Sequence, residues 1–257
     1  MKNFSVNIKK IWYSVTDGQG RPTDWIPMID DVKEGTLAIT QGTPSVTPLK
    51  NELGQTKASK IEASQKEIAL EIIGLDPNLI QKFAGGTSTN SGDTHEFKAT
   101  LAPNSLQRLG IMALSDNNVL YELPYVEFSA APQIDNTADG QRFVVNGAAL
   151  YPLDGTTSDF YFTILNETAA KKAAITAFTF ANIVGSATIN STAKTVTATV
   201  SSAGSATSIT PHITVSKGAY VSSPYSGETK NLATTTDYVV EAADGTKETW
   251  KVKVNQG

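Results

Sequence analysis

Alternation between apolar and polar residues predicts β-strands along most of the chain. Ile68, Leu70 and Ile72 alternate with Glu67 and Glu71, and this period of two is typical of a strand with one buried face. In the first two thirds of the chain, further strands are predicted at residues 4–15, 36–40, 97–101, 119–128, 142–151 and 160–165. The pattern therefore indicates a mainly β fold.

One short helix is predicted between residues 76 and 86. Asp76 suits the N-cap, Pro77 suits the first helical position, and Gly85 and Gly86 suit the end. The apolar stripe of this helix consists of Leu79, Ile80 and Phe83. A second turn is predicted at residues 103–109.

The last third of the chain has a denser rhythm of short strands. Seven are predicted, at residues 175–180, 188–189, 195–200, 212–215, 219–221, 238–242 and 249–254. Trp250, Val252 and Val254 alternate with polar residues, so we expect Trp250 in a core. This spacing predicts an immunoglobulin-like β-sandwich without a disulfide. Residues 166–174 could form one helical turn or a linker.

Two polar segments, residues 41–59 and 85–94, are predicted to be long loops. The first contains two prolines and two glycines, and the second is almost entirely Gly, Ser, Thr, Asn and Asp. Long loops without secondary structure are often functional, so we expect these two to become ordered against a partner.

Composition and charge divide the chain into two predicted domains, residues 1–168 and 169–257. The first has 13 Lys and Arg against 20 Asp and Glu, a balance of -7, and the second has 8 against 5, a balance of +3. An acidic first domain argues against tight DNA binding. No apolar run is long enough to span a membrane.

No motif in the sequence points to catalysis, a metal or a cofactor. The chain has no cysteine, which excludes disulfides and thiolate metal sites, and its only histidines are His95 and His212. Neither histidine lies in a recognisable catalytic motif, so we predict no enzyme activity and no cofactor. The first ten residues lack the apolar stretch of a signal peptide, which favours synthesis and retention in a cytoplasm.

The first domain resembles the major tail tube proteins of long-tailed bacteriophages. The resemblance rests on a strand that enters a Gly/Thr/Pro loop at residues 32–54, the strand at 66–73 and the helix with its Gly-Gly end at 76–86. The resemblance implies a tail-tube-type β-sandwich or barrel and rings of six subunits that stack into a conduit for DNA.

The second domain resembles a bacterial immunoglobulin-like domain of Bacteroidetes surface proteins. The residues that carry this resemblance are 175–180, 213–219, 222–227, 238–246 and 250–254. In a tail tube subunit, such a domain would decorate the outer surface.

Together the two resemblances predict a structural virion protein, made in the bacterial cytoplasm and located in the phage tail. The implied partners are copies of the chain, tail terminator, tape measure and baseplate-type proteins, DNA that passes without specific binding, and a weak host-surface glycan contact, with no membrane. The predicted lumen-facing residues are Glu62, Glu67 and Glu71, and the predicted inter-subunit loop contains Thr43, Pro44, Pro48, Leu49 and Glu52. The alternatives are another virion or injection-apparatus tube component and a carbohydrate-binding surface adhesin.

Overall fold

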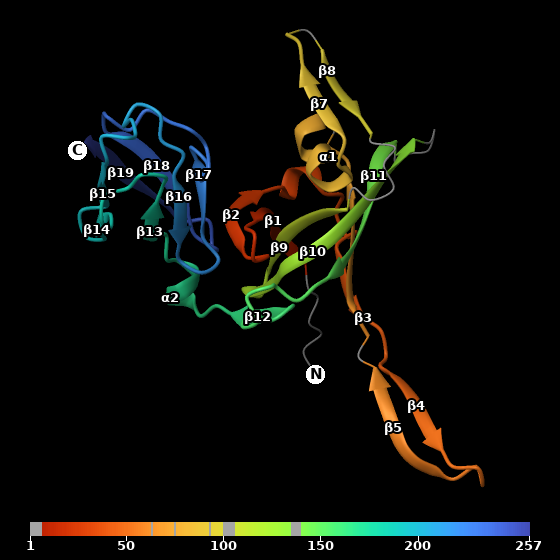
Figure 1. The fold of residues 1–257 in the computed structure, drawn as a ribbon. Helices are drawn as coiled ribbons and strands as arrows, with labels where there is room; N and C mark the ends of the chain where they lie inside the picture. The colour runs from red at the N-terminus through yellow and green to blue at the C-terminus, as the bar shows by residue number, and fades with distance from the viewer. Residues whose placement is uncertain (1–6, 63, 75, 93, 100–105, 135–139) are drawn as a thin grey trace. The chain divides into compact units, whose positions relative to one another are not determined.

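The computed structural model describes residues 7–62, 64–74, 76–92, 94–99, 106–134 and 140–257, and their fold is mainly β (Figure 1). This confirms the predicted fold class, including one short helix in the first part and a β-sandwich in the last part. No closed barrel forms among these residues, because the sheet order ends at the edge strands β2 (Pro22–Pro27) and β3 (Ala38–Gln41).

The chain forms two compact units that interleave along the sequence. The first contains the chain up to Ile29, Leu109–Pro124 and Pro152–Gly257, and the second contains Asp30–Arg108 and Tyr125–Tyr151. Strand β10 (Val119–Ile134) is shared, with the residues up to Pro124 in the first unit and those from Tyr125 in the second. The predicted division at residue 168 follows composition, whereas these units follow contacts, and that division stays a prediction.

One part of an eight-stranded sheet lies in the first unit. Its strands are β1 (Ile8–Thr16), β2 (Pro22–Pro27), β9 (Gln107–Ser115), the start of β10 (Val119–Ile134) and β12 (Tyr161–Ile164). Strand β1 lies between β2 and β9, with Tyr13 opposite both Ile26 and Ile111. Strands β2 and β9 were not predicted as strands. Strand β2 begins and ends with proline, and the buried run of β9 shows no alternation because both of its faces are covered.

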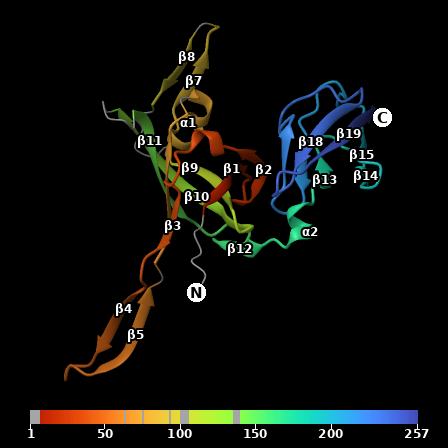
Figure 2. The same cartoon turned by 180° about the vertical axis from the view of Figure 1, so that it is seen from behind.

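The rest of the first unit is the immunoglobulin-like sandwich, drawn in green to blue in Figure 2. Its strands lie close to the predicted ranges. They are β13 (Ile175–Thr179), β14 (Thr188–Asn190), β15 (Thr195–Val200), β16 (His212–Val215), β17 (Tyr220–Ser223), β18 (Thr236–Glu241) and β19 (Lys247–Gln256). Strands β13 and β16 form one sheet, and the other five follow the order β14-β15-β19-β18-β17. Helix α2 (Glu167–Ala170), capped by Asn166, confirms the helical-turn alternative for this segment.

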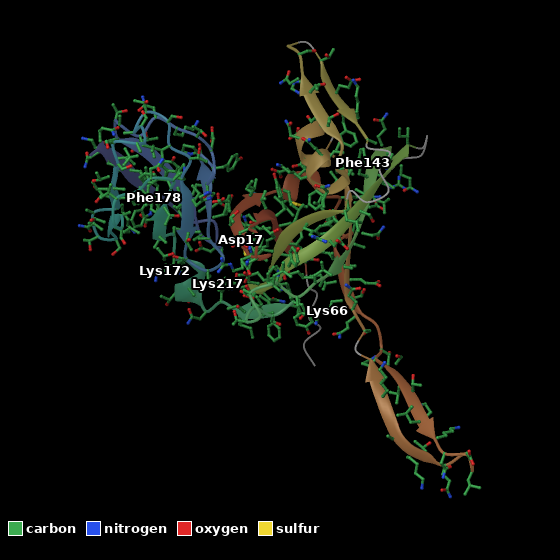
Figure 3. The ribbon with its side chains drawn as sticks, viewed as in Figure 1. Asp17, Lys66, Phe143, Lys172, Phe178 and Lys217 are labelled. Carbon is green, nitrogen blue, oxygen red and sulfur yellow. The ribbon has the colours of Figure 1, made fainter. Side chains whose placement is uncertain are left out.

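The core of the sandwich contains the aromatic residues that the alternation placed there. Trp250 has no exposed surface, and its indole N–H donates a hydrogen bond to the carbonyl oxygen of Ala173 over 3.1 Å. Tyr238 lies opposite Trp250 on the neighbouring strand and is equally buried. Figure 3 shows Phe178 within the same sandwich, where its ring contacts Phe180 edge to face. The predicted core position of Trp250 is confirmed.

In the second unit, helix α1 (Pro77–Ala84) packs on the other part of the eight-stranded sheet. The strands of this part are the end of β10, β11 (Gln141–Ala149), β6 (Lys66–Ile72) and β3 (Ala38–Gln41), in this order. Asp76 accepts a hydrogen bond from the Asn78 N–H over 2.9 Å, and Gly85 ends the helix, as predicted. Phe83 lies edge to face with Phe128, with ring centroids 5.1 Å apart.

The two predicted loops are β-hairpins, so that prediction was wrong. Residues 41–59 contain β4 (Ser45–Lys50) and most of β5 (Thr56–Glu62), and residues 85–94 contain β7 (Thr87–Asn90), which pairs with β8 (His95–Lys98). The first hairpin turns where the Asn51 side chain accepts hydrogen bonds from the N–H groups of Leu53 and Gln55. Strand β4 has both faces exposed, so its sequence lacks the one-sided apolar pattern that predicts a strand. The turn predicted at 103–109 lies partly outside the described residues, and from Gln107 onward the chain is strand β9.

Candidate functional site

A cavity of about 230 Å³ lies inside the first unit. Strand β2 forms one wall with Thr23 and Trp25, and the segment between β16 and β17 forms the opposite wall with Lys217 and Gly218. Ligand sites usually combine apolar or aromatic walls with a few polar groups. We refer to this cavity as the β2–β16 pocket.

Two aromatic side chains line the β2–β16 pocket. Trp25 is half-buried, and the absence of a side chain at Gly110 lets its ring approach β9, since a Cβ at that position would lie 3.1 Å from the indole. Tyr220 lies edge to face with the fully buried Trp12, with ring centroids 5.6 Å apart. Both rings are therefore held by packing.

A buried carboxylate and a lysine supply the charged part of the lining. Glu122 is only 6% exposed, and its two oxygens accept hydrogen bonds from the Tyr161 hydroxyl, over 2.9 Å, and from the Lys217 ammonium. The ammonium also lies 4.6 Å from the centre of the Tyr161 ring. Burial, followed by the negative charge of Glu122, raises the pKa of Tyr161, so its hydroxyl stays protonated and donates to the carboxylate.

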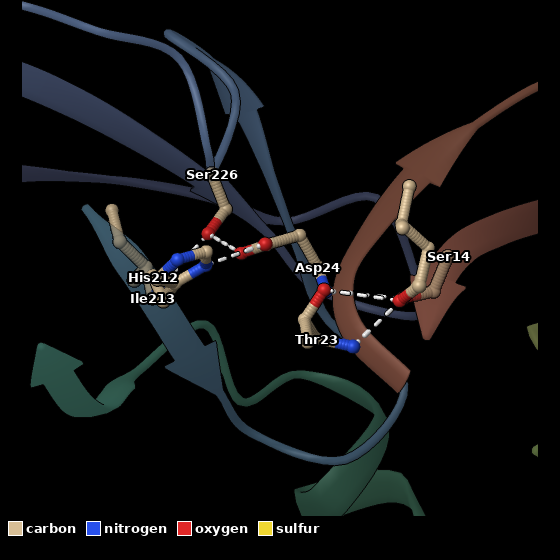
Figure 4. Close-up of polar contacts among 7 residues, drawn as sticks. Ser14, Thr23, Asp24, His212, Ile213 and Ser226 are labelled. Carbon is tan, nitrogen blue, oxygen red and sulfur yellow. Dashed lines mark hydrogen bonds and ion pairs between the residues drawn. The ribbon is translucent and has the colours of Figure 1, made fainter. Parts of the chain in front are cut away.

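Next to the pocket, a buried aspartate connects β2 to the sandwich (Figure 4). Asp24 accepts hydrogen bonds from the Ser226 hydroxyl and from Nδ1 of His212, the latter over 2.7 Å. Its own N–H donates to the Ser14 hydroxyl over 3.0 Å. The Ser226 hydroxyl also accepts the N–H of Ile213 over 2.7 Å.

These residue types match a hydrolase triad, but their arrangement does not. In a triad the serine donates to one imidazole nitrogen while the aspartate holds the other. Here Ser226 and His212 both contact the carboxylate of Asp24, so the imidazole has no role as a base for this serine. The cluster therefore serves to hold β2 against β16.

The residues predicted to face a lumen do not form one group. The side chains of Glu67 and Glu71 lie on the opposite face of β6 from its buried residues, as the alternation predicted, whereas Glu62 belongs to β5 of the first hairpin. Glu67 lines an open groove of about 450 Å³ in the second unit, together with Glu127 and Asn146. Glu71 instead lies 3.4 Å from both the ammonium of Lys33 and the guanidinium of Arg142.

The residues predicted to form an inter-subunit loop all lie on or beside the first hairpin. Their side chains are exposed, and Leu49 is 56% exposed on β4. The predicted residues are Thr43, Pro44, Pro48, Leu49 and Glu52. The structure thus brings these five residues together on one element, and their predicted contacts stay untested.

The described residues contain no group of three or more His, Asp and Glu side chains able to hold a metal ion. His95 lies on β8 of the second hairpin. Among the described residues, no helix has the length and apolar character needed to cross a membrane.

Comparison with known proteins relates one part of this chain to a family. Residues 175–254 match the family model described as "SGBP, N-terminal", where SGBP stands for surface glycan-binding protein. The match covers the sandwich strands from β13 nearly to the end of β19, which is less than a third of the chain. No curated protein matches the chain significantly.

Two solved structures align with about a third of the chain. One is a predicted glycoside hydrolase from Bacteroides thetaiotaomicron, with 25% identity, a TM-score of 0.32 and coverage of 36% of this chain and 27% of the other. The other is a predicted secreted protein from Bacteroides fragilis, with 25% identity, a TM-score of 0.30 and coverage of 35% of this chain and 98% of the other. This chain therefore spans about a quarter of the first protein. TM-scores this low support no conclusion about the activity of this chain.

The prediction of a phage tail tube subunit is wrong. The match of residues 175–254 to a family model of surface glycan-binding proteins contradicts the predicted virion location and the predicted ring, tail-protein and DNA partners. The resemblance to tail tube proteins rested on the order of strand, polar segment, strand and short helix. That order specifies no functional side chain, so it did not identify the function. The resemblance of the last third to Bacteroidetes surface proteins agrees with the comparisons.

Sequence reasoning missed the side chains that line the pocket. Trp25 lies in a segment flanked by prolines, and Glu122 follows Tyr121 in a strand where an acidic residue suggests an exposed face. Lys217 lies in a short turn with no motif. An acidic residue at a position where the alternation expects an apolar one, between Leu120 and Leu123, is the one signal that could have indicated a buried polar site.

Proposed function

We propose that this chain is a carbohydrate-binding protein of a bacterial cell surface. The observation that carries the proposal is the match of residues 175–254 to the N-terminal domain of surface glycan-binding proteins. The β2–β16 pocket supports it, because aromatic walls beside hydroxyl and charged groups suit sugar rings, which have C–H faces and hydroxyl edges.

Binding without catalysis is part of the proposal. Glycoside hydrolysis normally needs two carboxyl groups that face each other across the scissile bond, about 5 to 9.5 Å apart. Glu122 is the one acidic residue that lines the described pocket, and both of its oxygens already accept hydrogen bonds. Glu122 is therefore poorly placed to donate or accept a proton during bond cleavage.

Affinity electrophoresis of the whole chain tests the binding proposal. The protein should migrate more slowly in native gels that contain its polysaccharide than in gels without it, while serum albumin migrates equally in both. An assay for newly released reducing ends on the same polysaccharide should remain at background. Unchanged migration across a broad panel of plant, fungal and host polysaccharides would reject carbohydrate binding, and a steady release of reducing ends would reject the non-catalytic part.

A further inference from the structure

The β2–β16 pocket has the size and lining of a subsite for one sugar ring. We infer that it binds a single uncharged pyranose unit of a longer glycan, an inference that rests on the proposed carbohydrate-binding function. Its volume of about 230 Å³ is below the roughly 300 to 1,000 Å³ of clefts that hold drug-sized ligands. An oligosaccharide would therefore place one unit in the pocket and the others outside it.

The aromatic walls give the pocket a surface for the C–H face of the sugar. Trp25 is half-buried, so part of its ring is accessible while the rest is fixed above Gly110. Tyr220 is fixed in the same way by its edge-to-face contact with Trp12. Side chains already held by packing lose little conformational entropy on binding, which favours affinity.

The polar lining can satisfy the hydroxyl groups of the sugar. The Lys217 ammonium has three N–H donors, one of which bonds to Glu122, and its side chain is 45% exposed. Thr23 and Thr214 also line the pocket and are exposed, and the Thr23 hydroxyl, which donates to the Val15 carbonyl oxygen, can still accept a hydrogen bond. Both donors and acceptors are thus available at the rim.

The charges of the lining favour a neutral sugar. Lys217 and Glu122 are the two charged residues that line this pocket in the described structure, and they pair with each other. Because the two charges cancel, the lining offers no net positive charge to a uronic acid or a sulfated sugar. Such a sugar would lose hydration of its own charge on entering the pocket, and that cost would oppose binding.

Intrinsic fluorescence of the whole chain can report occupancy of this pocket. Of the three tryptophans, Trp12 and Trp250 have no exposed surface, and Trp25 is the partly accessible one. Titration with cellohexaose, laminarihexaose and mannohexaose should give a saturable change in emission with at least one of them. Polygalacturonate serves as the anionic comparison and should give a smaller change.

Three variants then separate the site from the function. Trp25→Ala should weaken binding, measured by calorimetry, at least about tenfold, and Thr214→Tyr should do the same by filling the cavity while leaving Trp25 in place. Phe162→Ala is the matched control, because Phe162 is 60% exposed in the same unit and does not line the pocket. It should bind as the wild type does. Thermal midpoints of all three should establish that they fold.

The outcomes are distinguishable. Wild-type binding that both pocket variants retain would overturn the site while leaving the proposed function intact. Stronger binding of polygalacturonate than of the neutral hexaoses would overturn the assignment to neutral sugars. Absence of binding to any hexaose, together with unchanged migration in polysaccharide gels, would overturn both the site and the function.

Discussion

Replacing Asp24 by alanine should destabilise the first unit, because this buried carboxylate connects β2 to the sandwich. The substitution removes the acceptor for the Ser226 hydroxyl and for Nδ1 of His212. Ser226 keeps its hydrogen bond from the Ile213 N–H, and the His212 side chain is 52% exposed, so water can replace part of the loss. Hydrogen bonds to charged groups contribute about 1.5 to 3 kcal/mol each, and the partial compensation leads us to expect a total loss of about 2 kcal/mol.

Differential scanning calorimetry of the whole chain measures this loss. A change of about 2 kcal/mol should lower the thermal midpoint of the first unit by about 4 to 8 °C. Asp237→Ala is the matched control, because its ion pair with Lys251 is exposed on both sides and should contribute about 0 to 1 kcal/mol. A double-mutant cycle of Asp24→Ala with Ser226→Ala should give a coupling energy of at least about 0.5 kcal/mol. Equal midpoints for Asp24→Ala and Asp237→Ala would refute the interpretation of Asp24 as a connection between β2 and the sandwich.

Three further predictions concern the core, the sheet and acid stability. Trp250→Ala should cost about 3 to 5 kcal/mol in urea unfolding, because Trp250 is fully buried, and a cost below 1 kcal/mol would contradict its core position. Gly147→Ala should cost about 1 to 3 kcal/mol in the same assay, since its Cβ would lie 2.6 Å from ring carbons of Phe128; wild-type stability would contradict this close approach. Burial tends to raise the pKa of Glu241, but the hydrogen bond and charge of Lys10, together with hydrogen bonds from Tyr220 and Lys247, lower it overall. A carboxyl group whose pKa is lowered in the folded state stabilises the fold above its ordinary pKa of 4.5, and this contribution is lost as the pH falls. Glu241→Gln should therefore reduce the pH dependence of the urea midpoint between about pH 5 and pH 3. An unchanged slope of the urea midpoint against pH would contradict the pairing of Glu241 with Lys10.

The sandwich could be predicted from sequence because each strand buries one face. Val196, Ala198 and Val200 are buried on β15 and the residues between them are not, so the period of two is visible in the sequence. Helix α1 could be predicted for a similar reason, since Asp76 and Gly85 mark its ends by local backbone chemistry. Both features depend on residues close together in sequence.

The unpredicted elements lack such a local signal. The hairpin of β4 and β5 has no buried face on β4, whereas β9 is buried on both faces, so neither strand alternates. Three of the pocket-lining side chains come from β2, β10 and the segment before β17, and each of these segments lies about 100 residues after the one before it. Only the tertiary fold brings Trp25, Glu122 and Lys217 together, and the acidic character of Glu122 gave no indication of its partners.

Isothermal titration calorimetry of the whole wild-type chain tests the central claim of carbohydrate binding most directly. The titrant is the neutral polysaccharide that slows the protein most in native gels. The account predicts a saturable heat of binding with a Kd of about 1 mM or tighter, equivalent to about -4.1 kcal/mol or more favourable. Heats equal to those of dilution across the titration would contradict it.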